Sequence, residues 1–337
     1  MPKQVILIYS IIHFIVDFAC MALATTLAEQ HQTSLWGAIV GYNFFAFFMQ
    51  IPLGIMADKL NKNALVAAGG CILILGALLC TKHPFYTCII AGIGNALFHL
   101  GGGIDVLNLS DKRATQIGIF VSTGALGIFF GKSMVHHLAI VAILLVISVG
   151  LLGYIYRSVC GKPDNLPTTF PVISFGKFLV ALGLIATVCL RSYVGCLAVF
   201  AWKSHYLLAV LAVSAVVLGK MVGGIIGDQV GFMPTAAVSL LVAAGAFLFA
   251  FNNSAAGLIA LICFNMTMPL TLTMLANLMP HHKGLAFGIL TAALFVGALP
   301  TFWGVNFLAT GPGLSLLSIL SAALLIPSIY QGEKYVV

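Results

Sequence analysis

The sequence consists of long apolar runs that are separated by short polar breaks. A helix needs about 20 residues to cross the hydrocarbon core of a bilayer, which is about 30 Å thick. Twelve runs have roughly this length, and they lack the alternation of apolar and polar residues that a membrane β-barrel strand requires. These runs occupy residues 5–28, 33–57, 64–81, 85–108, 115–133, 137–156, 172–195, 205–228, 233–251, 255–279, 285–305 and 311–330. The pattern predicts an all-α membrane protein with twelve transmembrane helices.

Composition supports this class. Hydrophobic residues make up 61% of the 337 residues and charged residues 7%, and the mean hydropathy is +1.13. A water-soluble chain of this length needs more charge to cover its surface. The first run carries His13 and Asp17 and is followed by no clear small-residue cleavage site, so we expect it to be a retained helix and not a signal peptide. The eight cysteines have no paired spacing, so we expect neither a zinc nor a redox centre and no cofactor.

The net charge of +7 reports orientation, because basic residues of membrane proteins gather in cytoplasmic segments. With the N-terminus inside, eleven basic residues fall on the cytoplasmic side and three on the other side, and Arg191 lies within a span. We therefore expect both termini in the cytoplasm and the protein in the plasma membrane. A nucleic-acid partner is not implied, and the expected partners are the lipid bilayer, a small solute and protons.

The second half of the chain repeats features of the first half at an offset of 170 residues. Gly54 and Asp58 fall on Gly224 and Asp228, and Asn95 falls on Asn265. Six spans therefore repeat as six, which predicts an N-terminal bundle over 1–156 and a C-terminal bundle over 172–337. The polar, proline-containing stretch 157–171 is the expected cytoplasmic linker. An even number of spans per repeat gives both bundles the same orientation, so they should be related by an axis along the membrane normal.

The stretch after the second span resembles the signature of the major facilitator superfamily. Gly54, Asp58, Lys59 and Lys62 stand at its glycine, acidic and basic positions, whereas Asn61 stands where glycine is usual. The second copy keeps an aspartate and both glycines around it but has Gln229 and no following base. The resemblance implies two pseudo-symmetric six-helix bundles, transport by alternating access, and a central cavity lined by the first, fourth, seventh and tenth spans.

Short matches within the spans resemble the fosmidomycin-resistance-type group of that superfamily. His13 and Asp17 match its His-x-x-x-Asp in the first span, and Gly94 to His99 matches its Gly-x-x-x-Phe-His in the fourth span. Leu100 follows where proline is usual, and Gly223 to Gly231 matches the end of its eighth span.

Ionisable residues within the spans are the first candidates for function, because a charged side chain at mid-membrane costs about 2.5–3.5 kcal/mol. Asp17, Asp105 and Arg191 are the clear cases. His13 lies one helical turn before Asp17 on the same face, so the two can share a proton. We expect Asp17 to bind and release the coupling proton, with His13 as its relay. The alternative is that Asp17 only bonds a neighbouring helix.

Arg191 stays charged at any realistic pH, so it must pair with an acid, with backbone carbonyls or with an anionic substrate. His99 lies one turn after Asn95 on the fourth span, and three glycines follow it. Asp105 is about 120° round that helix from His99 and can face another neighbour. The predicted substrate-binding residues are Arg191, His99, Asn95, Asp105, Asn265, Tyr42, Asn43 and Gln50. Helix packing is the alternative for each uncharged member of this set.

Gly54, Asp58 and Lys59 lie at a cytoplasmic span end, where a carboxylate can accept hydrogen bonds from the N-terminus of a neighbouring helix. We assign these residues to conformational gating, with Asp228 as the weaker counterpart in the second half.

The predicted function is secondary transport of a small polar or anionic solute or drug, coupled to protons, with export favoured and a monomer expected. The alternative is a divalent-cation transporter that uses His13, Asp17, His99 and Asp105 as ligands. An enzyme is disfavoured because no nucleophile stands with a base, and a channel because no repeated filter or charge ring occurs.

Overall fold

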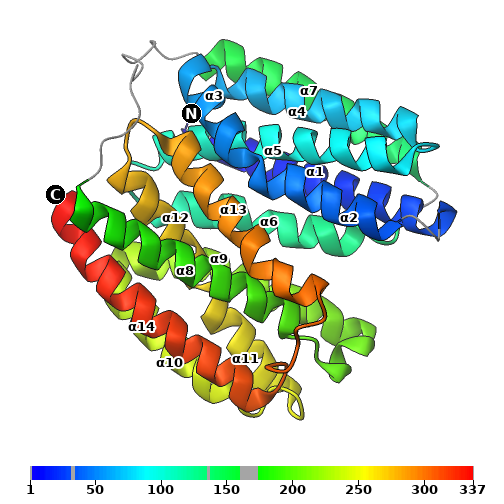
Figure 1. Ribbon diagram of the computed structural model, residues 1–337. Helices are drawn as coiled ribbons and strands as arrows, with labels where there is room; N and C mark the ends of the chain where they lie inside the picture. Colours follow the sequence, from blue (N-terminus) through cyan, green and yellow to red (C-terminus); the bar gives the residue numbers. More distant parts are fainter. Residues whose placement is uncertain (1, 32–34, 135–136, 160–173, 337) are drawn as a thin grey trace. The chain divides into compact units, whose positions relative to one another are not determined.

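The computed structural model describes residues 2–31, 35–134, 137–159 and 174–336 (Figure 1). Within these residues the chain forms helices and no strand. The helices of the first half are α1 (Pro2–Gln30), α2 (Leu35–Asn43), η1 (Phe44–Phe48), α3 (Gln50–Leu60), α4 (Asn63–Ala77), η2 (Leu78–Cys80), α5 (Pro84–Leu109), α6 (Ala114–Gly131) and α7 (Leu138–Val159). Those of the second half are α8 (Phe175–Leu197), η3 (Ala201–Ser204), α9 (Tyr206–Val230), α10 (Phe232–Phe247), α11 (Ser254–Asn265), α12 (Thr267–Leu278), α13 (Lys283–Phe302) and α14 (Gly311–Val336).

Twelve of these helical stretches are apolar enough to lie in a membrane, which confirms the predicted fold class. Ten are long enough to cross a bilayer by length and hydropathy, and two shorter apolar helices cover Thr115–Gly131 and Phe232–Phe247 within the described residues. The shorter two correspond to the fifth and ninth predicted spans. The chain is therefore an integral membrane protein.

The second predicted span is one continuous stretch in which the helix changes type. Phe44–Phe48 forms a π-helical turn, and the N–H of Met49 donates to the carbonyl of Phe44, five residues earlier, at 3.1 Å. Pro52 follows, and because proline has no N–H it cannot bond the carbonyl of Phe48. Single π turns of this kind are frequent at functional sites.

The tenth predicted span also contains an irregular turn, but here the helix is interrupted. The helix ends at Asn265 and restarts at Thr267, and Met266 between them bonds the carbonyl of Cys263, only three residues back, at 3.3 Å. Pro269 supplies the physical reason, since it cannot donate to the carbonyl of Asn265 four residues earlier.

The chain divides into two compact units. The first comprises Met1–Leu109, Thr123–Phe170 and His281–Ala292, and the second comprises Ser110–Ser122, Pro171–Pro280 and Ala293–Val337. Helices α6 and α13 are therefore each divided between the two units. The predicted linker 157–171 falls largely on residues 160–173, which lie outside the described residues, so the domain boundary predicted there stays a prediction.

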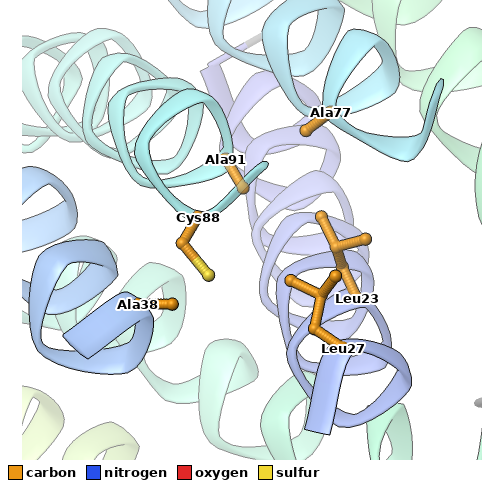
Figure 2. Close-up of a cluster of buried hydrophobic side chains, with 6 residues drawn as sticks. All are labelled: Leu23, Leu27, Ala38, Ala77, Cys88 and Ala91. Carbon is orange, nitrogen blue, oxygen red and sulfur yellow. The ribbon is translucent and has the colours of Figure 1, made fainter. Parts of the chain in front are cut away.

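Small side chains bring the helices of the first unit close together. The pairs α4 with α5, α4 with α7 and α1 with α5 pack along their lengths. Figure 2 shows one buried cluster, made of two leucines and four small residues from four helices: Leu23, Leu27, Ala38, Ala77, Cys88 and Ala91. Close approach of backbones through small residues is the usual basis of helix association in membranes.

Gly94 is such a contact point between α5 and α4. A Cβ at this position would lie 2.7 Å from the carbonyl oxygen of Gly70 and 2.8 Å from the side chain of Ile74. We expect Gly94→Ala to destabilise the protein by about 1–3 kcal/mol, because the added methyl group forces the two helices apart. The measurement is the midpoint of thermal unfolding in detergent.

Gly69→Ala is the matched control, because a Cβ at Gly69 meets no atom within 4 Å. It should leave the midpoint unchanged or raise it slightly. Equal midpoints for the two variants would contradict the close α4–α5 contact.

Candidate functional site

Helices α1 and α5 bring together a buried group of three ionisable side chains, His13, Asp17 and His99. The Nε2 atoms of the two histidines lie 2.8 Å apart. Asp17 Oδ2 lies 3.3 Å from His13 Nε2, and Asp17 Oδ1 lies 3.7 Å from His99 Nε2. The imidazole rings meet edge to face, and His13 is only 4% exposed. We call these residues the His–Asp–His group.

The hydrogen bonds of the group assign its protons. His99 Nδ1 lies 2.9 Å from the carbonyl oxygen of Asn95, so Nδ1 carries a hydrogen, because a carbonyl can only accept. In the neutral ring the lone pair is then on His99 Nε2. With both rings neutral, the hydrogen in the contact between the two Nε2 atoms then belongs to His13.

Asn95 supports the group through its side chain as well. Its Nδ2 donates to Asp17 Oδ1 at 3.1 Å and lies 3.7 Å from the sulfur of Cys20. The Cys20 thiol lies close to the side chain of Tyr42. Hence two residues predicted for substrate binding, Asn95 and His99, lie in one polar network with the two residues predicted for proton coupling.

Gly124 of α6 covers the group, and sequence analysis did not single it out. A Cβ there would lie 2.6 Å from His13 Nε2 and closer still to Asp17 Oδ2. Gly127, one turn later, packs against the same helix, where a Cβ would lie 2.9 Å from the backbone nitrogen of Phe18. The regular spacing of glycines along residues 118–131 was the available signal, but many glycines in membrane helices serve packing alone.

Asp105 belongs to a separate cluster. The hydroxyl of Tyr9 donates to Asp105 Oδ2 at 2.6 Å, and the Nδ2 of Asn63 donates to Oδ1 at 2.8 Å. Tyr9 is fully buried on α1, and Asn63 begins α4. Each carboxylate oxygen thus already has a donor. The predicted roles of Asp105 in substrate or metal binding stay predictions, and Tyr9 and Asn63 are partners that the sequence did not reveal.

Arg191 of α8 is the buried cation of the second unit. It is 9% exposed, and its Nη1 donates to the hydroxyl of Thr271 on α12 at 3.0 Å. Within the described part of the second unit, no carboxylate lies within 4.0 Å of its guanidinium. Among the described residues of this unit, the Thr271 hydroxyl is the single hydrogen-bond acceptor of the guanidinium.

The remaining predicted substrate residues bond their own helices. The amide nitrogens of Asn43, Gln50 and Asn265 donate to the carbonyls of Ile39, Ala46 and Leu261, each four residues earlier, at 2.9, 2.6 and 2.8 Å. Gln50 is fully buried, and its Oε1 has no hydrogen-bond partner among the described residues. All three residues lie beside the irregular turns of their spans.

Asp58 and Asp228 each cap the N-terminus of a helix. Asp58 accepts from the backbone N–H groups of Gly284 and Leu285 at 2.7 and 2.9 Å, at the start of α13. Asp228 accepts from the backbone N–H groups of Ala114 and Thr115 at 2.7 and 2.8 Å, at the start of α6, and also from the Thr115 hydroxyl. Asp228 thus has more donors than Asp58, whereas the sequence predicted it to be the weaker counterpart.

The two other predicted gating residues differ in their surroundings. Gly54 lies against Gly284, where a Cβ would overlap the carbonyl oxygen, and Lys59 is exposed. The gating role of this set stays a prediction.

Comparison with solved structures shows the fold of major facilitator transporters. The fucose:proton symporter FucP of E. coli matches with a TM-score of 0.67 and 13% identity, over 96% of this chain and 97% of that chain. The human organic anion transporter TETRAN matches with a TM-score of 0.66 and 13% identity, over 98% of this chain and 99% of that chain. A bacterial homologue of the iron transporter ferroportin matches with a TM-score of 0.65 and 12% identity, over 99% of this chain and 98% of that chain. These proteins are transporters and not enzymes.

Sequence comparison adds no closer relative, since no family model and no curated protein matches the chain. At identities this low the structural likeness shows the fold alone. The resemblance to the fosmidomycin-resistance-type group therefore stays a prediction.

The cap at α13 generates a prediction about stability. We expect Asp58→Asn to destabilise the protein by about 1 kcal/mol, because the amide keeps one acceptor oxygen but loses the charge that interacts with the helix dipole. Thermal unfolding in detergent measures the effect. Lys59→Gln, at the exposed neighbouring position, is the control and should leave the midpoint unchanged; a larger loss in the control than in Asp58→Asn would contradict the cap.

Proposed function

We propose that the protein is a secondary active transporter that moves a small polar or anionic solute across the plasma membrane by alternating access, coupled to protons and in the direction of export. The observation that carries the proposal is the buried His–Asp–His group in a chain with the fold of known transporters. As in the sequence-based prediction, both termini are cytoplasmic and the carrier is a monomer.

Proton binding at this group changes its net charge. With both histidines neutral, Asp17 gives the group one negative charge. One added proton, shared by His13 and His99, makes the group neutral. Since a net charge in a low-dielectric interior is costly, protonation lowers the cost of any conformation in which water leaves the site. This supports Asp17 and His13 as the coupling residues and adds His99 to them.

The solute proposal rests on Arg191. A guanidinium is planar, always charged and suited to carboxylate or phosphate. Among the described residues of the second unit, one of its donors has a partner. Thr271 holds the guanidinium in place, because its hydroxyl accepts from Arg191 Nη1 and donates to the carbonyl of Met268. Among the proteins of similar fold, TETRAN is an organic anion transporter and FucP a proton symporter, which is consistent with an anionic solute and proton coupling.

The two helix caps supply a way to lock one conformation. Each consists of a carboxylate and the exposed N–H groups of a helix start, so it can break and re-form as a unit with little rearrangement elsewhere. We propose that Gly54, Asp58 and Lys59, together with Asp228, hold the cytoplasmic side closed in one state of the cycle.

The divalent-cation alternative uses His13, Asp17, His99 and Asp105 as ligands. The first three have ligand atoms within 4.8 Å of one another, whereas the carboxylate of Asp105 accepts from Tyr9 and Asn63. A metal as cargo is therefore the second candidate. A ferroportin homologue is among the proteins of similar fold, but fold alone assigns no cargo.

Proton coupling is tested in proteoliposomes with an anionic solute chosen by a thermal-stabilisation screen of the purified protein. Wild-type uptake should follow an imposed pH gradient. Asp17→Asn should lose this gradient-driven uptake, because its group cannot cycle between one negative charge and none, while saturable counterflow of solute continues.

The control for that experiment is Glu29→Gln, which removes an exposed acid from the same helix and should leave the pH response intact. Gradient-driven uptake by Asp17→Asn at the wild-type rate would refute coupling at this residue. Flux without saturation or counterflow would indicate a channel.

Arg191 is tested with the same solute. We expect Arg191→Gln to weaken binding roughly tenfold or more, because a hydrogen bond to a charged group is worth about 1.5–3 kcal/mol. Isothermal titration calorimetry measures the affinity. Arg113→Gln, at an exposed position, is the control with the same loss of charge; equal affinities for wild type and Arg191→Gln would exclude Arg191 from the solute site.

A further inference from the structure

We propose that His13, Asp17 and His99 also bind one divalent first-row transition-metal ion, of which Zn²⁺ is the representative, and that the bound ion arrests transport. The binding claim rests on the geometry of the group alone. The claim that transport stops rests on the proposed function, because it requires the same atoms to take part in the transport cycle.

The ligand atoms match what such an ion needs. Two imidazole nitrogens and one carboxylate oxygen are ligands that Zn²⁺, Co²⁺, Ni²⁺ and Fe²⁺ accept, whereas Mg²⁺ and Ca²⁺ prefer sites built from oxygen. At metal–ligand distances of about 2.0–2.1 Å, the ligand atoms of a tetrahedral site lie about 3.3 Å apart. The three separations here are 2.8, 3.3 and 3.7 Å, so small side-chain shifts suffice to bind the ion.

Asn95 holds two of the three ligands in the orientation that metal binding requires. Its carbonyl accepts from His99 Nδ1, which leaves the lone pair of Nε2 directed at the group. Its side chain donates to Asp17 Oδ1, which leaves Oδ2 toward His13. Metal-binding histidines and carboxylates characteristically have such second hydrogen bonds, and these bonds fix the tautomer and the direction of the ligand.

Gly124 packs α6 directly against the ligand atoms. A Cβ at this position would lie 2.6 Å from His13 Nε2 and would overlap Asp17 Oδ2, so this side of the group is closed. A fourth ligand, such as water, therefore has to approach from a side that α6 does not cover. Three protein ligands and one exchangeable position are the usual arrangement of an accessible zinc site.

The ion would occupy the atoms that the proposed function assigns to the transport cycle. It needs the lone pairs of both Nε2 atoms and an oxygen of Asp17, and it links α1 to α5 through three bonds. These three side chains are then fixed and cannot take part in the cycle for as long as the ion stays bound.

The binding test uses the purified full-length chain in detergent and Co²⁺ as a spectroscopic probe. We expect one Co²⁺ per chain, with the visible absorption of a four-coordinate site, and displacement of Co²⁺ by Zn²⁺ but not by Mg²⁺. His99→Gln should abolish this absorption. Asn95→Leu keeps all three ligands but removes the side-chain donor to Asp17, and should weaken binding roughly 10- to 100-fold.

The control variant His83→Gln removes an exposed histidine and should bind Co²⁺ like wild type. Should His99→Gln not fold, X-ray absorption of the Zn²⁺-loaded wild type should show two imidazoles and oxygen ligands at the zinc. Absence of Co²⁺ binding by wild type, unchanged binding by a folded His99→Gln, or a zinc spectrum without two imidazoles would each overturn the site.

The transport claim is tested separately in the proteoliposomes described above. Zn²⁺ at a saturating concentration should stop pH-driven uptake by wild type. Uptake that continues at full rate, or Zn²⁺ that itself accumulates inside the liposomes, would overturn the arrest. If pH-driven uptake is absent from the start while Co²⁺ binds to the group, proton coupling fails and the metal site stands.

Discussion

The cost of placing charge inside a bilayer governs the structure of this protein. Asp17 lies near the middle of a membrane-spanning helix, where a carboxylate is stable only if its oxygens receive hydrogen bonds or a positive charge. Oδ1 accepts from Asn95 Nδ2 on α5, and Oδ2 faces His13 Nε2 one turn earlier on α1. Stabilising this carboxylate thus requires α5 to lie beside α1.

The same need extends along one face of α1. Tyr9, His13 and Asp17 follow one another at intervals of four residues, and each meets a polar side chain of α5. A helix that packs closely against such a polar face needs small residues at the contact. Gly124 and Gly127 on α6 fulfil this requirement, because a side chain at either position would collide with the polar residues or with their backbone. The two glycines therefore allow α6 to pack closely against the helix that carries His13 and Asp17.

Much of this could be predicted from sequence, and the limits have physical causes. Apolar runs of membrane length identify twelve spans, because the bilayer imposes that length on each helix. Asp17, His13, Asp105 and Arg191 stand out because ionisable residues in such runs are rare. Their partners Tyr9, Asn63 and Thr271 do not stand out, because neutral polar residues cost little in a helix and give no signal of their own. Which of several polar residues pair across helices depends on helix rotation, and the sequence specifies that only loosely.

Electroneutrality connects the two halves of the proposed mechanism. The His–Asp–His group of the first unit has one negative charge until it binds a proton, and Arg191 of the second unit has one positive charge until it meets an anion. In the proposed mechanism, each of these two sites becomes neutral by binding its own ligand. If the change of conformation carries the buried groups through surroundings with little water, the neutral forms cross most readily. On this account the low dielectric constant of the membrane makes the change of conformation depend on what each of the two sites has bound.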